Sequence, residues 1–251
     1  MYRIPVSAVS YINTLPFLYG LRNSPVINRI DLSLDVPSEG AAKLERGEAL
    51  VALVPTAVLL TLKESKIVSP YCIGCDGPVR SVCLFSDVPL EQVESVFLDP
   101  DSRTSNLLLR LLLSEFWKLS PELIMRDRMN PVVQSKNSAS LVIGDAALKR
   151  EALYTYDLGA AWKNYTDLPF VFACWIAISR VPADFLEEFN TALKEGISNP
   201  AACIDPLRAG RAELVEYLLH SISYHFDVKK QEALKLFIEK VSSKNFVASE
   251  V

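Results

Sequence analysis

Apolar residues in this chain gather into short continuous runs instead of alternating with polar residues. The clearest runs are ALVALVP (49–55), SVCLFS (81–86), SVFLD (95–99), SLVIG (140–144) and FVFACWIAIS (170–179), and a shorter one lies within IPVSAVSYI (4–12). Strands that bury both faces have this pattern, whereas half-exposed strands alternate. We therefore predict an α/β fold with mixed or parallel sheets.

Helical patterns fill the segments between these runs. The pattern over residues 105–119 starts at Ser105, a residue type that caps helices, and a proline follows its end. A second helix is expected from Asp184, because Glu187 stands three positions on, as in a capping box. Two more helical patterns occupy the tail, over residues 206–243, with SISYHFD between them.

No Gly/Ser-rich linker divides the chain, so we expect two lobes joined by crossing strands rather than two separate domains. The runs 81–86 and 170–179 are the candidate crossings. Residues 81–175 would then form one lobe, and residues 1–80 and 176–251 together the other. A bilobal α/β body of this kind binds its ligand in the central cleft.

Four places repeat one arrangement, in which an apolar strand is followed by a short polar loop and a helix start. They are SYINTLPF (10–17), LVPTAVLL (53–60), DPDSRTSNLLLR (99–110) and VIGDAALK (142–149). The free N–H groups of a helix start accept an anion, and ligands of open α/β sheets lie beyond the strand ends. The alternative is that Asn13, Thr56, Ser105 and Asp145 are only helix caps, each contributing about 1 kcal/mol.

The loop DPDSRTSN is the most informative of the four. Ser102, Thr104 and Ser105 place three hydroxyls within four positions, which suits the binding of one carboxylate. Arg103 either reaches the ligand or holds the loop to an acidic neighbour. Ser81 begins a candidate crossing strand and would face the cleft, unless its hydroxyl only bonds the backbone at the strand edge.

Composition and motifs exclude several classes of function. A net charge of −4 gives no basic footprint, so nucleic acid is not an expected partner. No apolar run reaches the roughly 20 residues of a membrane span and no secretory signal is evident, so we expect a cytoplasmic protein without membrane contact. No nucleotide-binding glycine motif or G-x-S-x-G is present, and we expect no metal and no cofactor.

Cysteines and histidines add no catalytic site. The five cysteines, at positions 72, 75, 83, 174 and 203, are an odd number and include one C-x-x-C without a second pair, so we interpret them as free, partly buried thiols. His220 and His225 lie in the C-terminal region and are interpreted as partly buried residues at helix ends. A Ser-His-Asp hydrolase therefore has little support.

Several of these stretches resemble the menaquinone-biosynthesis family of the futalosine pathway (the MqnA/MqnD family), and in particular its chorismate dehydratase branch. The resemblance rests on YINTLPF, GCDGPVRSVCLFS, SRTSNLLLRLLL, LVIGDAAL and YDLGAAWKNYTDLPFVFACW, and covers residues 11 to about 175. It implies a bilobal fold like that of type II periplasmic binding proteins. The sister branch, 1,4-dihydroxy-6-naphthoate synthase, opens with an SPCPNDT-like segment, from which SAVSYINTLPF departs.

The resemblance also implies a reaction, in which chorismate loses water to give 3-[(1-carboxyvinyl)oxy]benzoate. Asn13 and Ser81 would then lie closest to the chemistry, as groups that stabilise charge on the departing oxygen. The residues expected to bind the substrate are Tyr11, Thr56, Ser102, Arg103, Thr104, Ser105, Gly144 and Asp145.

The proton acceptor stays open at this point. The acidic candidates are Asp76, Asp99, Asp101 and Asp145, and the alternative is the enolpyruvyl carboxylate of the substrate itself. A naphthoate synthase-like enzyme and a non-catalytic protein that binds small carboxylates are the competing functions. Monomer and homodimer both remain open. Five aromatic residues near the motifs are either core or a wall for the substrate ring: Tyr11, Phe17, Trp162, Phe172 and Trp175.

Overall fold

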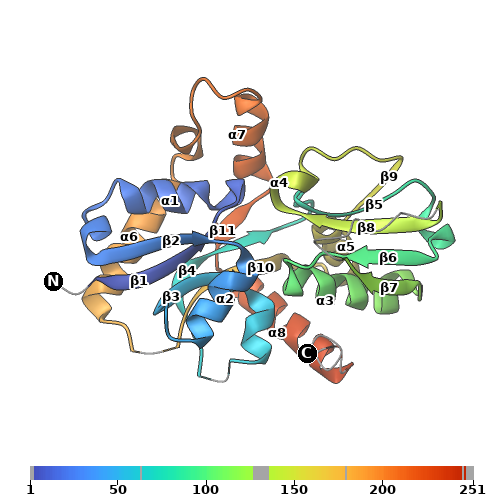
Figure 1. Ribbon diagram of the computed structural model, residues 1–251, viewed down its shortest axis with the longest axis horizontal. Helices are drawn as coiled ribbons and strands as arrows, with labels where there is room; N and C mark the ends of the chain where they lie inside the picture. Colours follow the sequence, from blue (N-terminus) through green and yellow to red (C-terminus); the bar gives the residue numbers. More distant parts are fainter. Residues whose placement is uncertain (1–2, 63, 127–135, 179, 245, 247–251) are drawn as a thin grey trace.

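Two mixed β-sheets, side by side and each flanked by helices, organise this computed structural model (Figure 1), which describes residues 3–62, 64–126, 136–178, 180–244 and 246. The first sheet has the order β11-β4-β10-β3-β1-β2 and the second the order β7-β6-β8-β5-β9. The strands are β1 (Ile4–Val9), β2 (Ile30–Asp35), β3 (Val51–Pro55), β4 (Lys66–Cys75), β5 (Val82–Ser86), β6 (Ser95–Leu98), β7 (Glu122–Met125), β8 (Ser138–Ile143), β9 (Tyr154–Asp157), β10 (Phe170–Ala177) and β11 (Ser223–His225).

The continuous apolar runs form the inner strands of these sheets. All five residues of β3 and all five of β5 are buried, because helices or the opposite lobe cover both faces. In the first sheet β1 pairs in parallel with β2 and β3, whereas β10 runs antiparallel to β3 and β4. The predicted α/β class with mixed sheets is confirmed. Position 179, the expected end of β10, lies outside the described residues.

The chain crosses between the sheets twice. After β4 it enters β5 through residues 76–81, and after α5 (Leu158–Thr166) it returns through a turn at Asp167, whose φ is 58°. The return is complete by Phe170, which already pairs with Cys75 of the first sheet. The range 81–175 therefore takes in six residues too many at its end, because Phe170–Trp175 belong to the first sheet.

The remaining helices are α1 (Leu15–Arg22), α2 (Pro37–Glu45), α3 (Arg103–Leu112), α4 (Gly144–Ala147), α6 (Ala183–Ile197), α7 (Arg211–His220) and α8 (Val228–Ser243). The expected start of α3 at Ser105 was wrong. Ser102 is the cap, because its hydroxyl accepts the hydrogen bond from the Ser105 N–H (3.2 Å). Within the described residues, no helix is both long and apolar enough to cross a bilayer.

Helix α6 lacks the expected capping box. Its cap is Pro182, which has no side-chain acceptor, and Asp184 instead pairs with Arg29 at 2.8 Å. The apolar face of α6 packs on α1 so closely that a Cβ on Gly20 would lie 1.9 Å from the carbonyl oxygen of Ala192. Glycine is required there because the two backbones touch. This contact fixes α1, and with it the loop that precedes α1.

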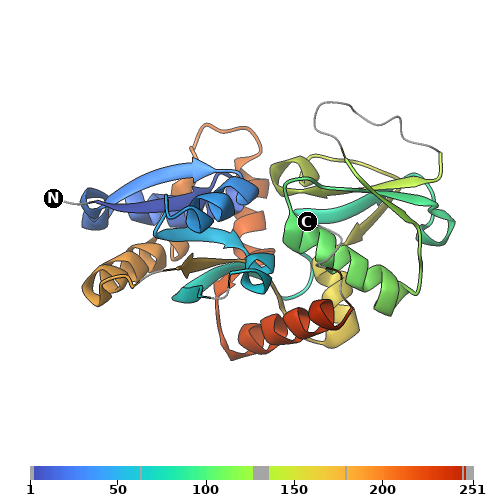
Figure 2. The same ribbon diagram turned by 60° about the horizontal axis from the view of Figure 1, so that its bottom comes forward.

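The C-terminal region contributes more than the two expected helices. Between α7 and α8 the chain forms β11, an edge strand paired with β4, and His225 lies in it with an exposed side chain. His220 is the last residue of α7 and is also exposed. The position of His220 at a helix end is as expected, but the expected partial burial of both histidines and the helical position of His225 were wrong. Figure 2 shows α8 lying across both halves of the molecule.

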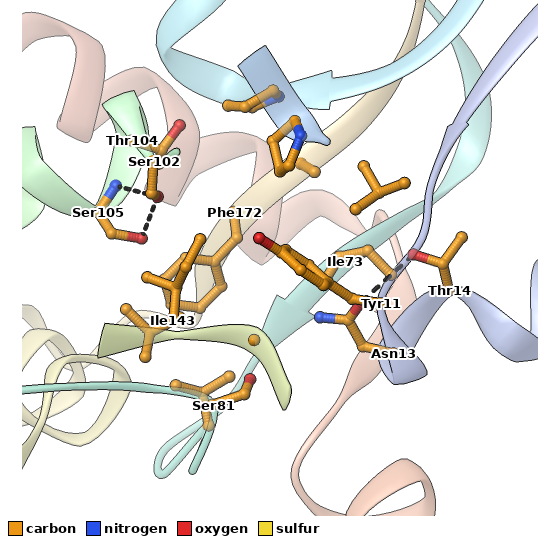
Figure 3. A pocket seen from close by; sticks show the side chains of 17 residues that line it. Tyr11, Asn13, Thr14, Ile73, Ser81, Ser102, Thr104, Ser105, Ile143 and Phe172 are labelled. Carbon is orange, nitrogen blue, oxygen red and sulfur yellow. Dashed lines mark hydrogen bonds between the residues drawn. The ribbon is translucent and has the colours of Figure 1, made fainter. Parts of the chain in front are cut away.

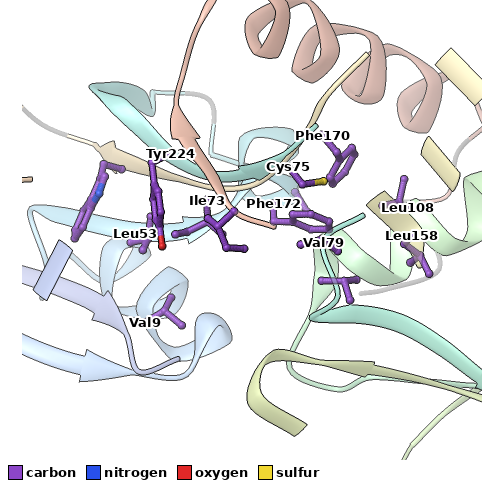
Figure 4. Close-up of a cluster of buried hydrophobic side chains, with 14 of the residues drawn as sticks. Val9, Leu53, Ile73, Cys75, Val79, Leu108, Leu158, Phe170, Phe172 and Tyr224 are labelled. Carbon is purple, nitrogen blue, oxygen red and sulfur yellow. The ribbon is translucent and has the colours of Figure 1, made fainter. Parts of the chain in front are cut away.

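One buried hydrophobic cluster runs beneath the junction of the two lobes (Figure 4). It includes Leu53 and Ile73 from the first sheet, Leu108 and Leu158 from helices of the second lobe, and Phe172 between them. Four of the five cysteines are buried free thiols, as expected, and Cys203 is partly exposed. The continuous core makes the floor of the cleft rigid, which is what a preformed site requires.

Candidate active site

A narrow cavity lies between the lobes, where the ends of β1, β3, β5 and β8 approach one another. About 570 Å³ within it is free of protein atoms, open solvent at its mouth included. Its polar lining consists of one amide and six hydroxyls, from Tyr11, Asn13, Thr14, Ser81, Ser102, Thr104 and Ser105. The structure thus brings together seven side chains from three separate segments of the sequence (Figure 3).

Asn13 lies in the short 3-10 turn (Ile12–Thr14) between β1 and α1. Its backbone carbonyl accepts a hydrogen bond from the Tyr224 hydroxyl (2.9 Å), and its Oδ1 accepts one from Thr14 (3.3 Å). Asn13 is therefore not a helix cap, since Thr14 precedes α1 in that position. With Oδ1 engaged and the Tyr217 hydroxyl also bonded to this side chain, Asn13 has one N–H of its amide nitrogen left to offer to a ligand.

Ser81 stands directly before β5 and is held from three sides. Its carbonyl accepts a hydrogen bond from the Gly144 N–H (2.8 Å), and its Oγ accepts one from the Tyr217 hydroxyl (2.8 Å). The preceding residue, Arg80, has a left-handed φ of 62°, and its N–H donates to Asp157 at 2.6 Å. Because its hydroxyl bonds a side chain from another element, Ser81 is more than a strand-edge serine.

The SRTS loop forms the opposite wall, at the start of α3. The hydroxyls of Ser102 and Ser105 lie 2.7 Å apart and both line the cavity. Thr104 lines it too, while its Oγ1 accepts a hydrogen bond from the Ala57 N–H (3.0 Å) of the other lobe. The first-turn N–H groups of α3 give this wall a partial positive charge that favours a carboxylate.

Two expected binding residues of this region lie outside the cavity lining. The Arg103 side chain is exposed and does not line the cavity. Among the described contacts it neither faces a ligand site nor pairs with an acidic neighbour. Thr56 is fully buried behind Thr104 and donates to the carbonyl of Val171 (2.9 Å). Thr56 is also not a helix cap, because it is the first residue of its 3-10 turn (Thr56–Leu60).

Of the neighbours Gly144 and Asp145, only Gly144 lines the cavity. Gly144 lines the cavity at φ 64°, and a Cβ there would lie 3.1 Å from the Tyr11 ring, so glycine lets the ring lie against the backbone. Asp145 is outside the lining. Its Oδ1 accepts a hydrogen bond from the Ile12 N–H (3.0 Å), which joins the second lobe to the first.

The cavity lining has no charged side chain among the described residues. The acidic candidates for the proton acceptor, Asp76, Asp99, Asp101 and Asp145, all lie outside it. Asp76 pairs with Lys163 (3.0 Å). Asp99 pairs with Arg126 (3.0 Å), although burial raises the pKa of its carboxyl above the usual range.

The apolar part of the lining suits a small ring. Tyr11 and Phe172 line the cavity together with Ile73 and Ile143 (Figure 3). The other three aromatic candidates, Phe17, Trp162 and Trp175, are fully buried core residues. Hydroxyls, one amide and a helix start around an apolar floor can bind a small aromatic or alicyclic acid and donate hydrogen bonds to a departing oxygen.

Two tyrosines of the C-terminal region contact site residues and were not predicted from the sequence. Tyr217 of α7 contacts Ser81, and Tyr224 of β11 contacts the backbone of Asn13. Both are buried. The only available signal was that a tyrosine interrupts each apolar stretch of the tail, since buried hydroxyls usually have a partner.

Comparisons with known proteins point to one family. A family model described as menaquinone biosynthesis matches residues 4–243. A chorismate dehydratase of Thermus thermophilus is 29% identical over 230 residues, which cover 81% of this chain and 84% of that protein. A chorismate dehydratase of Campylobacter jejuni is 24% identical over 94% of this chain and 97% of its own length.

Solved structures confirm the fold. Protein AF1704 from Archaeoglobus fulgidus superposes with a TM-score of 0.73 at 16% identity, covering 97% of this chain and 98% of its own. The periplasmic aliphatic sulphonate binding protein SsuA from Escherichia coli gives a TM-score of 0.56 at 11% identity, over 98% and 94% of the two chains. The expected bilobal fold of periplasmic binding proteins is thereby confirmed.

Proposed function

The chain belongs to the menaquinone-biosynthesis family, and from this premise we propose that it is a chorismate dehydratase, a carbon–oxygen lyase. The substrate would be chorismate and the product 3-[(1-carboxyvinyl)oxy]benzoate. The observation that carries the proposal is the uncharged lining, in which Asn13 and Ser81 share one cavity with the hydroxyls of the SRTS loop.

The substrate would lie in this cavity with one carboxylate at the SRTS loop and its ring against the aromatic residues. Chorismate is a dicarboxylate whose ring carries a hydroxyl at C4 and an enolpyruvyl ether at C3. Ser102 and Ser105, with the start of α3, would bind one carboxylate by hydrogen bonds and without a salt bridge. The ring would lie against Phe172 and Tyr11.

The reaction forms an aromatic ring, which supplies its thermodynamic drive. The C3–H bond breaks and its electron pair becomes the new ring double bond, while the C4–O bond breaks with its pair on the departing oxygen. The proton passes first to the acceptor at C3 and then to that oxygen, which leaves as water. Ser81 and the amide nitrogen of Asn13 would donate hydrogen bonds to it; one such donor contributes about 3 kcal/mol of transition-state stabilisation.

We propose the substrate's own enolpyruvyl carboxylate as the proton acceptor at C3. The described lining has neither a carboxylate nor an imidazole, and Asp145, which follows the lining residue Gly144, accepts a hydrogen bond from Ile12 instead. A carboxylate of the substrate is held close to C3 by its own bonds, so the step is intramolecular and gains from proximity.

Turnover of chorismate tests the proposal directly. Incubation of the protein with chorismate should deplete it and produce one equivalent of an aromatic acid 18 mass units lighter, followed by absorbance and mass spectrometry. Ser81→Ala should lower kcat by about a hundredfold or more. Binding of chorismate without turnover would favour a carboxylate-binding protein, and no binding at all would favour the naphthoate synthase branch.

A further inference from the structure

Helix α7 contacts a residue of the cavity wall through one side chain. Of its ten residues only Tyr217 and Leu218 are buried, and Figure 1 shows α7 standing above the junction of the two lobes. The Tyr217 side chain is 1% exposed, and its hydroxyl donates to the Oγ of Ser81 at 2.8 Å. A mostly exposed helix thus buries a tyrosine against a residue of the cavity wall.

This hydrogen bond decides where the proton of Ser81 points. Each hydroxyl has one proton, and Tyr217 donates its own to the Oγ of Ser81. The Ser81 proton is therefore directed to another acceptor. Because Ser81 lines the cavity, that direction leads to the ligand.

Tyr217 keeps its proton throughout the working pH range. Burial raises the pKa of its hydroxyl well above the usual value, and the hydrogen bonds to Ser81 and Asn13 offset only part of that rise. Tyr217 is thus a permanent donor and no base. It also touches the two residues that the resemblance placed closest to the chemistry.

We propose that Tyr217 is a positioning residue, which holds Ser81 as a hydrogen-bond donor toward the departing oxygen of the substrate. The inference rests on the proposed dehydratase function and deepens it. It assigns to the C-terminal helix α7 a part in the reaction. Without the tyrosine hydroxyl, the Ser81 proton is free to rotate away, and the donor is available for only part of the time.

The test is a double-mutant cycle with Tyr217→Phe and Ser81→Ala. Tyr217→Phe should lower kcat about tenfold while KM changes less than about threefold, since the lost hydrogen bond acts in the transition state. In the Ser81→Ala background the same change should have no further effect on kcat, because Tyr217 acts through Ser81. Additive losses in the cycle would overturn the inference.

A matched control removes a different tyrosine hydroxyl. Tyr156 of β9 accepts a hydrogen bond from the Leu90 N–H (2.8 Å) and lies outside the cavity lining. Tyr156→Phe should leave kcat unchanged. An equal loss of kcat in both variants would show a general effect of lost stability and would also overturn the inference.

A second measurement covers the case in which Tyr217→Phe does not fold. A tetrafluorinated tyrosine placed at position 217 keeps nearly the same shape and lowers the pKa of the hydroxyl by more than burial raises it. An alkaline decline of kcat should then appear, because the ionised hydroxyl cannot donate to Ser81; an unchanged pH profile contradicts the inference. A wild-type protein inert toward chorismate would overturn the proposed function. An active wild-type protein in which the losses from Tyr217→Phe and Ser81→Ala are additive would overturn this inference alone.

Discussion

The carboxylate of Asp145 accepts a hydrogen bond from the backbone N–H of Ile12 at 3.0 Å, across the cleft between the lobes. The second lobe, through Asp145, thereby holds the turn of the first lobe that carries Asn13. Asp145 therefore holds two walls of the cavity together and does not itself line the cavity.

Replacement of Asp145 should affect binding more than the chemical step. Asp145→Asn keeps an oxygen that accepts from Ile12, so we expect kcat within about tenfold of wild type and a modest rise in KM. Asp76→Asn, whose partner Lys163 is on the surface, should change kcat less still. Steady-state kinetics checks both, and a loss of three orders of magnitude in kcat for either variant would instead indicate a protein base.

Thr104 should be essential for the contact between the lobes. Thr104→Val keeps the shape but leaves the buried Ala57 N–H without its acceptor, which should cost about 1–3 kcal/mol of unfolding free energy and raise KM. Thr104→Ser should retain most of both. Chemical denaturation and kinetics measure the effects, and Thr191→Val on the exposed face of α6 serves as the control. Equal losses from Thr104→Val and Thr191→Val would contradict the prediction.

The loop before Ser81 should depend on Asp157. This carboxylate caps α5 through Ala160 and also accepts from the N–H groups of Val79 and Arg80, which holds Arg80 in its left-handed conformation. Asp157→Ala should therefore lower stability and kcat together, because Ser81 follows Arg80 directly. The expected loss in kcat is about tenfold or more.

A matched cap variant separates the two effects of Asp157. Asp227 caps α8 in the same way through Lys230, away from the cavity. Asp227→Ala should lower stability by about 1 kcal/mol or more and leave kcat unchanged. If both cap variants lowered kcat alike, the loss would reflect stability and not the position of Ser81.

A salt bridge between α8 and the second lobe should make stability depend on acid pH. Lys240 donates to Glu115 at 2.7 Å, and this contact with that of Tyr165 lowers the pKa of Glu115 to about 2. The unfolded carboxyl titrates near its ordinary value of about 4.3, so the folded state binds fewer protons between these values. The stabilisation is complete above the unfolded pKa and is lost as the pH falls toward about 2.

Glu115→Gln tests this linkage. The variant should be less stable than wild type by about 1–3 kcal/mol at pH 7, and the difference should shrink as the pH falls below about 4. Denaturant unfolding across this pH range measures it. Glu239→Gln, an exposed residue 3.9 Å from Lys235, should show almost no difference at any pH. A difference for Glu115→Gln that stays constant with pH would contradict the linkage.

The buried strands and the polar loops behind them were predictable from the sequence. Continuous runs such as those of β3 and β5 indicate strands because only a strand covered on both faces uses apolar residues at every position. Ser102, Thr104 and Ser105 were predictable as a group because hydroxyls at a helix start bond the backbone or face a ligand site. Here Ser102 caps the helix, and all three residues line the cavity.

The roles of single polar residues were not predictable. Arg103 and Thr56 belong to the right loops, but one side chain points to solvent and the other lies behind the cavity wall. The direction of a side chain depends on the twist of its strand or helix and on neighbours from other elements. Local sequence patterns give neither the twist of an element nor its neighbours from other elements.

The sequence by itself determined the α/β class, the polar loops at the strand ends and the hydroxyl side chains in those loops. Burial and helix capping follow from local patterns, so these features can be read from the residues alone. Only the tertiary structure decided that Asp145 meets Ile12 and that Tyr217 meets Ser81, a residue 136 positions away. Contacts of such separation arise when two lobes and a C-terminal helix pack together, and packing is a property of the whole chain.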